Sequence, residues 1–191
     1  MKKINFSDRY GLTQAVIEGR KTMTRRMISG GPLLPEDRIE EASICPDGFV
    51  SIIANGGESL MEVKYSYKVG EIVAVAQNYR SCGNYHVPKE HPGWSNKLFV
   101  NPALMPYQIR ITGIKCERLQ DISNTDCLKE GIRQAYEESI LGMYGYIDHK
   151  GTGLWFNTPR KAFAALIDKV SGRGTWASNP WVVAYEFELV K

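Results

Sequence analysis

Residues 107–119 read Tyr-Gln-Ile-Arg-Ile-Thr-Gly-Ile-Lys-Cys-Glu-Arg-Leu. Apolar residues at 109, 111, 114 and 116 alternate with polar residues such as Arg110, Lys115 and Glu117. Such alternation is typical of a β-strand that buries one face and exposes the other. We therefore predict one long, half-exposed strand here and place the other elements around it.

Further strands and helices are expected on both sides of this run. Strands are predicted at 3–6, 69–76 and 181–190, and a hairpin at 49–53 and 60–64. Helices are predicted at 10–18, ended by Gly19, at 121–130, ended by Gly131, and at 158–172, where Thr158 caps and Pro159 opens the first turn. Residues 81–96 and 135–157 are expected to be long loops. About six strands and three or four helices without a βαβ rhythm predict an α+β fold with an antiparallel or mixed sheet curling into a small barrel.

Composition sets the class of protein. The chain has 191 residues, of which 43% are apolar and 24% charged, so a single domain spanning 1–191 can bury its own core. We find no run of ~20 apolar residues and no signal-peptide pattern, and we expect a cytoplasmic protein with no membrane partner. The formal net charge of +3 is too small to declare a nucleic-acid-binding protein by itself.

The cysteines argue against a metal or disulfide framework. Cys45, Cys82, Cys116 and Cys127 show no Cys-x-x-Cys spacing, so we expect reduced thiols. A zinc site at Cys82, His86 and His91 is a weak alternative because the spacing is irregular. We expect no metal and no cofactor.

Positive charge gathers in one segment after the first helix. Residues 19–26 read Gly-Arg-Lys-Thr-Met-Thr-Arg-Arg. A lysine three residues before a threonine can place its amine near the hydroxyl if the segment turns. Neighbouring arginines would help Lys21 to lose its proton. The alternative is that these cations simply complement the dipole at a helix end.

Three stretches resemble the ASCH family, a PUA-like barrel. They are residues 19–26, the strand running into Glu-Arg-Leu-Gln-Asp-Ile-Ser (117–123) with Glu130-Gly131 after it, and the final strand entered through Asn-Pro-Trp (179–181). The resemblance covers most of the chain and extends to larger phage and gut-bacterial members. It implies a basic cleft and association with RNA. In compact bacterial members it also implies hydrolysis of the acetyl amide of N4-acetylcytidine.

The resemblance assigns catalysis to Lys21, Thr24 and Glu130. Thr24 is then the nucleophile and Lys21 its base. Glu130 ends a helix, where the dipole disfavours a carboxylate, which suits a group that exchanges protons with a leaving amine. The alternative places the Glu130 side chain in solvent, paired with Arg133 or Lys129.

Binding residues complete the predicted site. Arg20, Arg25 and Arg26 are candidates to grip phosphate or a base edge, and Tyr79 or Trp155 to offer a stacking face. Trp155, between Gly153 and Asn157, is expected to lie in an exposed loop. Trp181 and Tyr185 are expected in the core.

Three functions remain open from the sequence. The first is binding of RNA or a modified nucleoside, with amidohydrolase activity on substrates like N4-acetylcytidine. The second is an RNA-binding module without catalysis. The third is an accessory protein of a mobile element that binds a protein partner.

Overall fold

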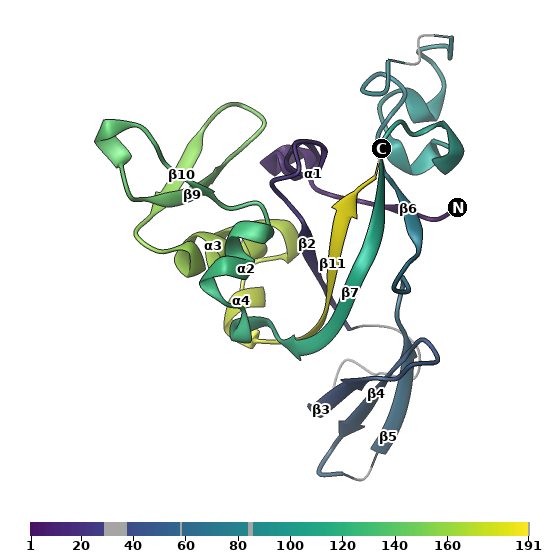
Figure 1. Ribbon diagram of the computed structural model, residues 1–191, viewed down its shortest axis with the longest axis vertical. Helices are drawn as coiled ribbons and strands as arrows, with labels where there is room; N and C mark the ends of the chain where they lie inside the picture. Colours follow the sequence, from purple (N-terminus) through teal and green to yellow (C-terminus); the bar gives the residue numbers. More distant parts are fainter. Residues whose placement is uncertain (29–37, 58, 84–85, 191) are drawn as a thin grey trace.

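The computed structural model describes residues 1–28, 38–57, 59–83 and 86–190. Within them the chain forms eleven strands and four α-helices, with short 3-10 turns between (Figure 1). The strands build mixed and antiparallel sheets, so the predicted α+β class is confirmed. None of the described helices is long and apolar enough to cross a membrane.

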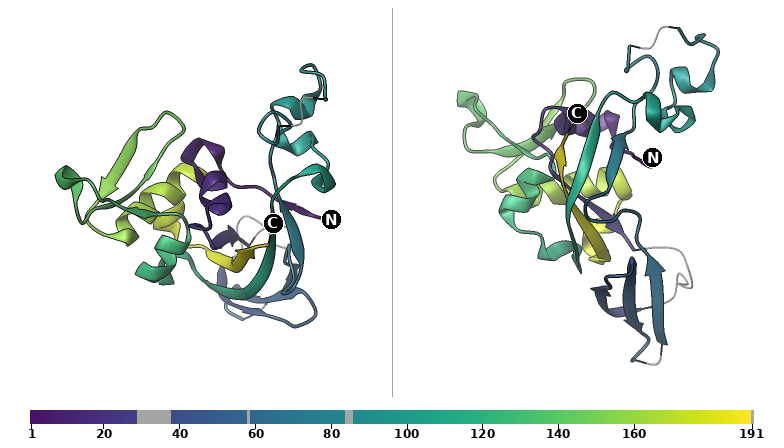
Figure 2. Two further views of the ribbon diagram at one scale, coloured as in Figure 1. Left: turned by 45° about the horizontal axis from the view of Figure 1, so that its top comes forward. Right: turned by 45° about the vertical axis from the view of Figure 1, so that its right-hand side comes forward.

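The largest sheet has five strands in the order β1-β6-β7-β11-β2. They are β1 (Lys3–Ile4), β6 (Ile72–Val75), β7 (Gln108–Arg118), β11 (Trp181–Leu189) and β2 (Met23–Met27). The predicted long strand is β7, at the centre of this sheet. β1 and β6 run parallel, and the other neighbours are antiparallel. β1 and β2 form the two edges and do not pair among the described residues, so the sheet is open. The sheet is also strongly curved (Figures 1 and 2).

Two smaller antiparallel sheets flank the large one. The first contains β3 (Ile39–Ile44), β4 (Phe49–Ala54) and β5 (Ser59–Lys64), so the predicted hairpin is confirmed and gains a third strand. The second contains β8 (Arg133–Gln134), β9 (Tyr144–Ile147) and β10 (Gly153–Phe156). The prediction that 135–157 is a loop is therefore wrong, because β9 and β10 pair as a hairpin.

The helices cover one side of the large sheet (Figure 2). They are α1 (Leu12–Ile17), α2 (Asn124–Lys129), α3 (Pro159–Ser171) and α4 (Thr175–Ser178). Thr158 caps α3 by accepting a hydrogen bond from the backbone N–H of Lys161, as predicted. The first helix starts later than predicted, since a 3-10 turn at Asp8–Tyr10 and Gly11, with φ of 64°, precede it.

Two groups of buried apolar residues hold these layers together. The main group draws on all three sheets and on α3, and includes Ile111, Tyr146, Phe163 and Tyr185. The second joins Ala74 and Ala76 to Tyr79, Val100 and Met105. Short 3-10 turns, including Pro92–Trp94, give structure to part of the segment expected as a loop at 81–96, of which residues 84–85 lie outside the described residues.

Candidate functional site

The basic segment begins as a turn and continues as a strand. Gly19 adopts a left-handed φ of 71° and ends the helical region, as predicted. The backbone N–H groups of Arg20 and Lys21 both donate to the carbonyl of Ala15 at 2.9 Å. The N–H of Thr22 then donates to the carbonyl of Lys129 at 2.9 Å. This bond fixes the start of β2 against the end of α2, and so brings residue 21 beside residue 130.

Lys21 and Glu130 form a buried ion pair. The Lys21 Nζ lies 2.6 Å from Glu130 Oε2, and their side chains are 2% and 6% exposed. The same ammonium donates to the backbone carbonyls of Met23 at 2.7 Å and Glu130 at 2.9 Å. All three of its hydrogens therefore have an acceptor. The alternative that placed Glu130 in solvent beside Arg133 or Lys129 is wrong.

Arg25 holds the other carboxylate oxygen of Glu130. Its Nη1 lies 3.0 Å from Glu130 Oε1, and its Nη2 lies 2.6 Å from Glu117 Oε1 and 3.1 Å from Asp126 Oδ2. Lys115 bridges Glu117 and Asp126 at 3.0 and 3.1 Å. Three cations thus face three carboxylates, and the guanidinium of Arg25 is occupied by its own protein rather than open to phosphate.

Burial and pairing act on these cations in opposite directions. Removal from water lowers the pKa of Lys21, although Glu130 partly opposes this effect. Burial also disfavours the charged form of Arg25, but Glu130 and Glu117 outweigh it, and the pKa of Arg25 is raised. Lys21 is therefore the cation of this network that gives up a proton more readily.

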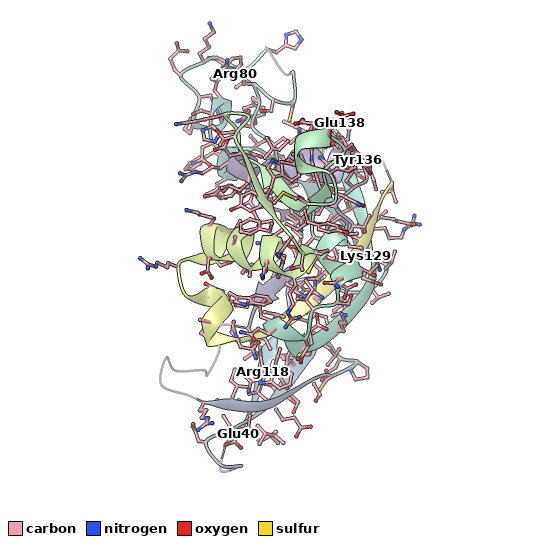
Figure 3. All side chains as sticks on the ribbon, turned by 90° about the vertical axis from the view of Figure 1, so that its left-hand side faces the viewer. Glu40, Arg80, Arg118, Lys129, Tyr136 and Glu138 are labelled. Carbon is pink, nitrogen blue, oxygen red and sulfur yellow. The ribbon has the colours of Figure 1, made fainter. Side chains whose placement is uncertain are left out.

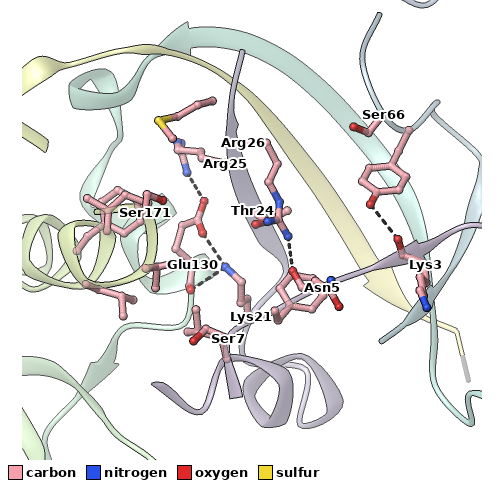
Figure 4. Close-up of a pocket in the computed structure, with 18 residues that line it drawn as sticks. Lys3, Asn5, Ser7, Lys21, Thr24, Arg25, Arg26, Ser66, Glu130 and Ser171 are labelled. Atoms are coloured by element: carbon pink, nitrogen blue, oxygen red, sulfur yellow. Dashed lines mark hydrogen bonds and ion pairs between the residues drawn. The ribbon is translucent and has the colours of Figure 1, made fainter. Parts of the chain in front are cut away.

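A pocket of about 500 Å³ opens against this ion pair. Lys21, Thr24, Arg26 and Glu130 line it together, so the structure brings the three predicted catalytic residues to one cavity (Figure 4). Phe163, Leu166 and Val170 of α3 form an apolar part of the wall. Arg26 also lines the cavity, with its guanidinium donating to the carbonyl of Asn5. Thr24 makes no hydrogen bond with Lys21 or Glu130 side chains in the described part of the chain.

The other predicted binding residues lie away from this pocket. Arg20 pairs with Glu18 at 2.5 Å and lines a second pocket, which Trp155 also lines. Trp155 lies on β10 rather than in a loop. Tyr79 is 7% exposed in the second apolar group, with its ring edge-to-face against His91. Tyr185 is buried and Trp181 packs against the main group, as predicted.

Cysteine and histidine residues form no metal centre in the part of the chain that the structure describes. All four cysteines are free thiols in the structure. His91 instead accepts a hydrogen bond from the N–H of Gly93 at 2.9 Å.

Sequence reasoning missed two carboxylates of the network, Glu117 and Asp126. Asp126 precedes Glu130 by four residues, the spacing that places two side chains on one helix face. Glu117 occupies a polar position of β7, which sequence alternation assigns to solvent. No local signal links Glu117 to Arg25, because the two come together only through pairing of β7 and β2 with β11.

No family model matches the sequence. No curated protein and no solved structure shows a significant match either.

Proposed function

We propose that the protein is an amidohydrolase that acts on an acylated nucleoside such as N4-acetylcytidine. One observation carries the proposal: a buried Lys21–Glu130 pair at 2.6 Å forms part of the wall of a pocket that Thr24 also lines. The ASCH resemblance and the PUA-like barrel belong to this proposal, and the substrate comes from that resemblance.

Acylation uses the proton shared by the ion pair. When that proton lies on Glu130, the Lys21 amine is neutral and takes the hydroxyl proton of Thr24, directly or through one water. The Thr24 oxygen attacks the amide carbonyl carbon, and Arg26 stabilises the oxyanion. The C–N bond then breaks as Glu130 gives its proton to the leaving amine. The acyl group remains as an ester on Thr24.

Hydrolysis of that ester restores the starting state. The Glu130 carboxylate takes a proton from water, and the resulting hydroxide attacks the ester carbonyl. The Thr24 oxygen leaves with the proton that Lys21 holds. Lys21 is then neutral and Glu130 protonated again, so one amide and one water have become one acid and one amine.

The proposal is tested by measuring how fast the protein releases acetate from N4-acetylcytidine. Lys21→Met is expected to lower the rate by about 10²–10⁴-fold, the usual contribution of a general base. Thr24→Ala is expected to abolish turnover, whereas Thr24→Ser keeps a hydroxyl and retains part of it. Thr112→Ala on the exposed side of β7 is the matched control and leaves the rate unchanged.

Two outcomes would overturn the proposal. The first is acetate release by wild-type protein no faster than in buffer at high protein concentration. The second is a folded Thr24→Ala protein as active as wild type. Binding of RNA without turnover would favour the non-catalytic module instead, and co-purification of a protein partner would favour the accessory protein.

A further inference from the structure

A second pocket, of about 580 Å³, shares none of its described lining residues with the first. Residues next to the buried pair in sequence, Arg20 and Lys129, line it together with Arg133, Tyr136 and Trp155. The proposed amide hydrolysis makes no use of this pocket.

One wall of the second pocket carries a flat aromatic surface. Trp155 pairs with Gly145 across β10 and β9, and Gly145 pairs with Arg133 across β9 and β8. Paired residues of neighbouring strands point to the same face of a sheet, so Arg133, Gly145 and Trp155 form one row on that face.

Two glycines make room for the indole. A Cβ on Gly153 would lie 2.5 Å from Trp155 Nε1, and one on Gly145 would lie 2.8 Å from Trp155 Cε3. Both distances are shorter than carbon atoms tolerate, so the ring lies over the two backbone positions. The indole is thus held flat against the hairpin while the residue lines the pocket.

Positive charge borders this aromatic surface. Arg20 and Arg133 share one carboxylate, that of Glu18, at 2.5 and 3.9 Å. Lys129 is paired with Glu186 at 3.0 Å, and Glu137 is the acidic member of the lining. Burial, and to a lesser degree the charge of Arg20, lower the pKa of Arg133. Because the two guanidiniums share a single carboxylate, a net positive charge remains at this wall to attract an anion.

An exposed tyrosine lies at the same pocket. Tyr136 is 86% exposed although it lines the cavity. Tyr136 and Lys129 lie toward the same side of the molecule in Figure 3. Aromatic faces combined with basic side chains are the usual means of binding single-stranded nucleic acid, since every base has a π-face and every nucleotide a phosphate.

We propose that the second pocket binds a nucleotide of a single-stranded nucleic acid, with the base on the Trp155 indole and a phosphate at Arg133 and Arg20. This binding goes beyond the proposed hydrolysis and does not require it. The two neighbouring guanidiniums, of Arg20 and Arg133, favour a nucleotide over an apolar peptide in this pocket.

Fluorescence anisotropy with short labelled single strands tests this binding. Trp155→Ala is expected to raise the Kd by about 5- to 150-fold, which corresponds to the usual contribution of one stacked base. Trp155→Phe keeps an aromatic face and restores most of the affinity. Arg133→Gln is expected to reduce the slope of log K against log salt by about 0.7, the value for one lost phosphate contact on a single strand. Arg173→Gln, an exposed arginine outside both pockets, is the matched control.

Several results would overturn the inference. They are no binding of either an RNA or a DNA strand by wild-type protein, unchanged affinity in folded Trp155→Ala and Arg133→Gln variants, or equal binding of duplex and single strand. Stronger competition by an apolar peptide than by unlabelled strand would also overturn it. Acetate release from free N4-acetylcytidine should stay at the wild-type rate in Trp155→Ala, so the two proposals can fail separately.

Discussion

Replacing Glu130 by leucine would leave the ammonium of Lys21 in the interior with only backbone carbonyls as partners. Removing one member of a buried pair typically costs about 3–5 kcal/mol of stability. The cost of removing the proton from Lys21 gives an independent limit on this loss of stability. Holding a lysine neutral at pH 7, about 3.4 pH units below its ordinary pKa of about 10.4, costs about 4.6 kcal/mol. We therefore expect Glu130→Leu to lose about 3–5 kcal/mol at pH 7.

The same reasoning gives a sign for the pH dependence. In this variant the folded state binds no proton at Lys21, whereas the unfolded state binds one until the pH passes its ordinary pKa. Since the unfolded state holds more protons, stability must rise with pH, by about 1.4 kcal/mol per unit. Between pH 7 and 9 the variant should itself recover about 2.7 kcal/mol. In wild type Glu130 opposes the effect of burial on the pKa of Lys21, so the slope should be smaller.

Urea denaturation followed by circular dichroism at pH 7, 8 and 9 measures these quantities. Glu188→Leu is the matched control, because it breaks a surface pair with Arg110 at 3.2 Å and should cost about 0–1 kcal/mol. Lys21→Met combined with Glu130→Leu should remove the slope, since no buried amine remains. If Glu130→Leu shows the same pH profile as wild type, Lys21 stays charged in the fold and the argument from burial is wrong.

Three further expectations follow from single contacts. Thr158→Ala removes the cap of α3 and should cost about 1 kcal/mol, visible in calorimetry as a Tm lower by about 2–4 °C; an unchanged Tm would contradict the cap. Burial raises the pKa of the Cys127 thiol to about 12. In native protein at pH 8 a thiol reagent should therefore label Cys45 first, and Cys127 only after urea is added. Equal labelling rates for the two thiols would contradict this expectation. Gly145→Ala places a Cβ 2.0 Å from the carbonyl oxygen of Leu154, so we expect a loss of stability of about 1–3 kcal/mol and a change in tryptophan fluorescence. A variant with wild-type stability and fluorescence would contradict this packing.

Much of the fold was predictable because it depends on local signals. Alternation over 107–119 predicted β7, and Thr158-Pro159 predicted the start of α3. Gly19 and Gly131 marked two chain reversals that need a positive φ, which the structure shows at 71° and 103°. Each of these features is determined by a few neighbouring residues.

The unpredicted parts depend on pairing with distant segments. β2 is a strand because Met23–Met27 pairs with β11, and its cationic sequence carries no strand pattern. The β9–β10 hairpin is rich in glycine, and a glycine-rich sequence predicts a loop. Gly145 and Gly153 are instead required because the Trp155 indole lies over them. The resemblance predicted that Lys21 and Glu130 share one site. It did not predict that Arg25 is an internal ion-pair partner. Arginine is rarely buried unless it is paired, so its burial depends on carboxylates from distant segments.

The place of β2 at the sheet edge also bears on synthesis of the chain. β2 pairs only with β11 among the described strands, and β11 is synthesised after all the other described strands. Glu130, too, is made 109 residues after its lysine partner. During translation Lys21 must therefore remain hydrated until Glu130 has emerged, and β2 can join the sheet only after β11 has been made.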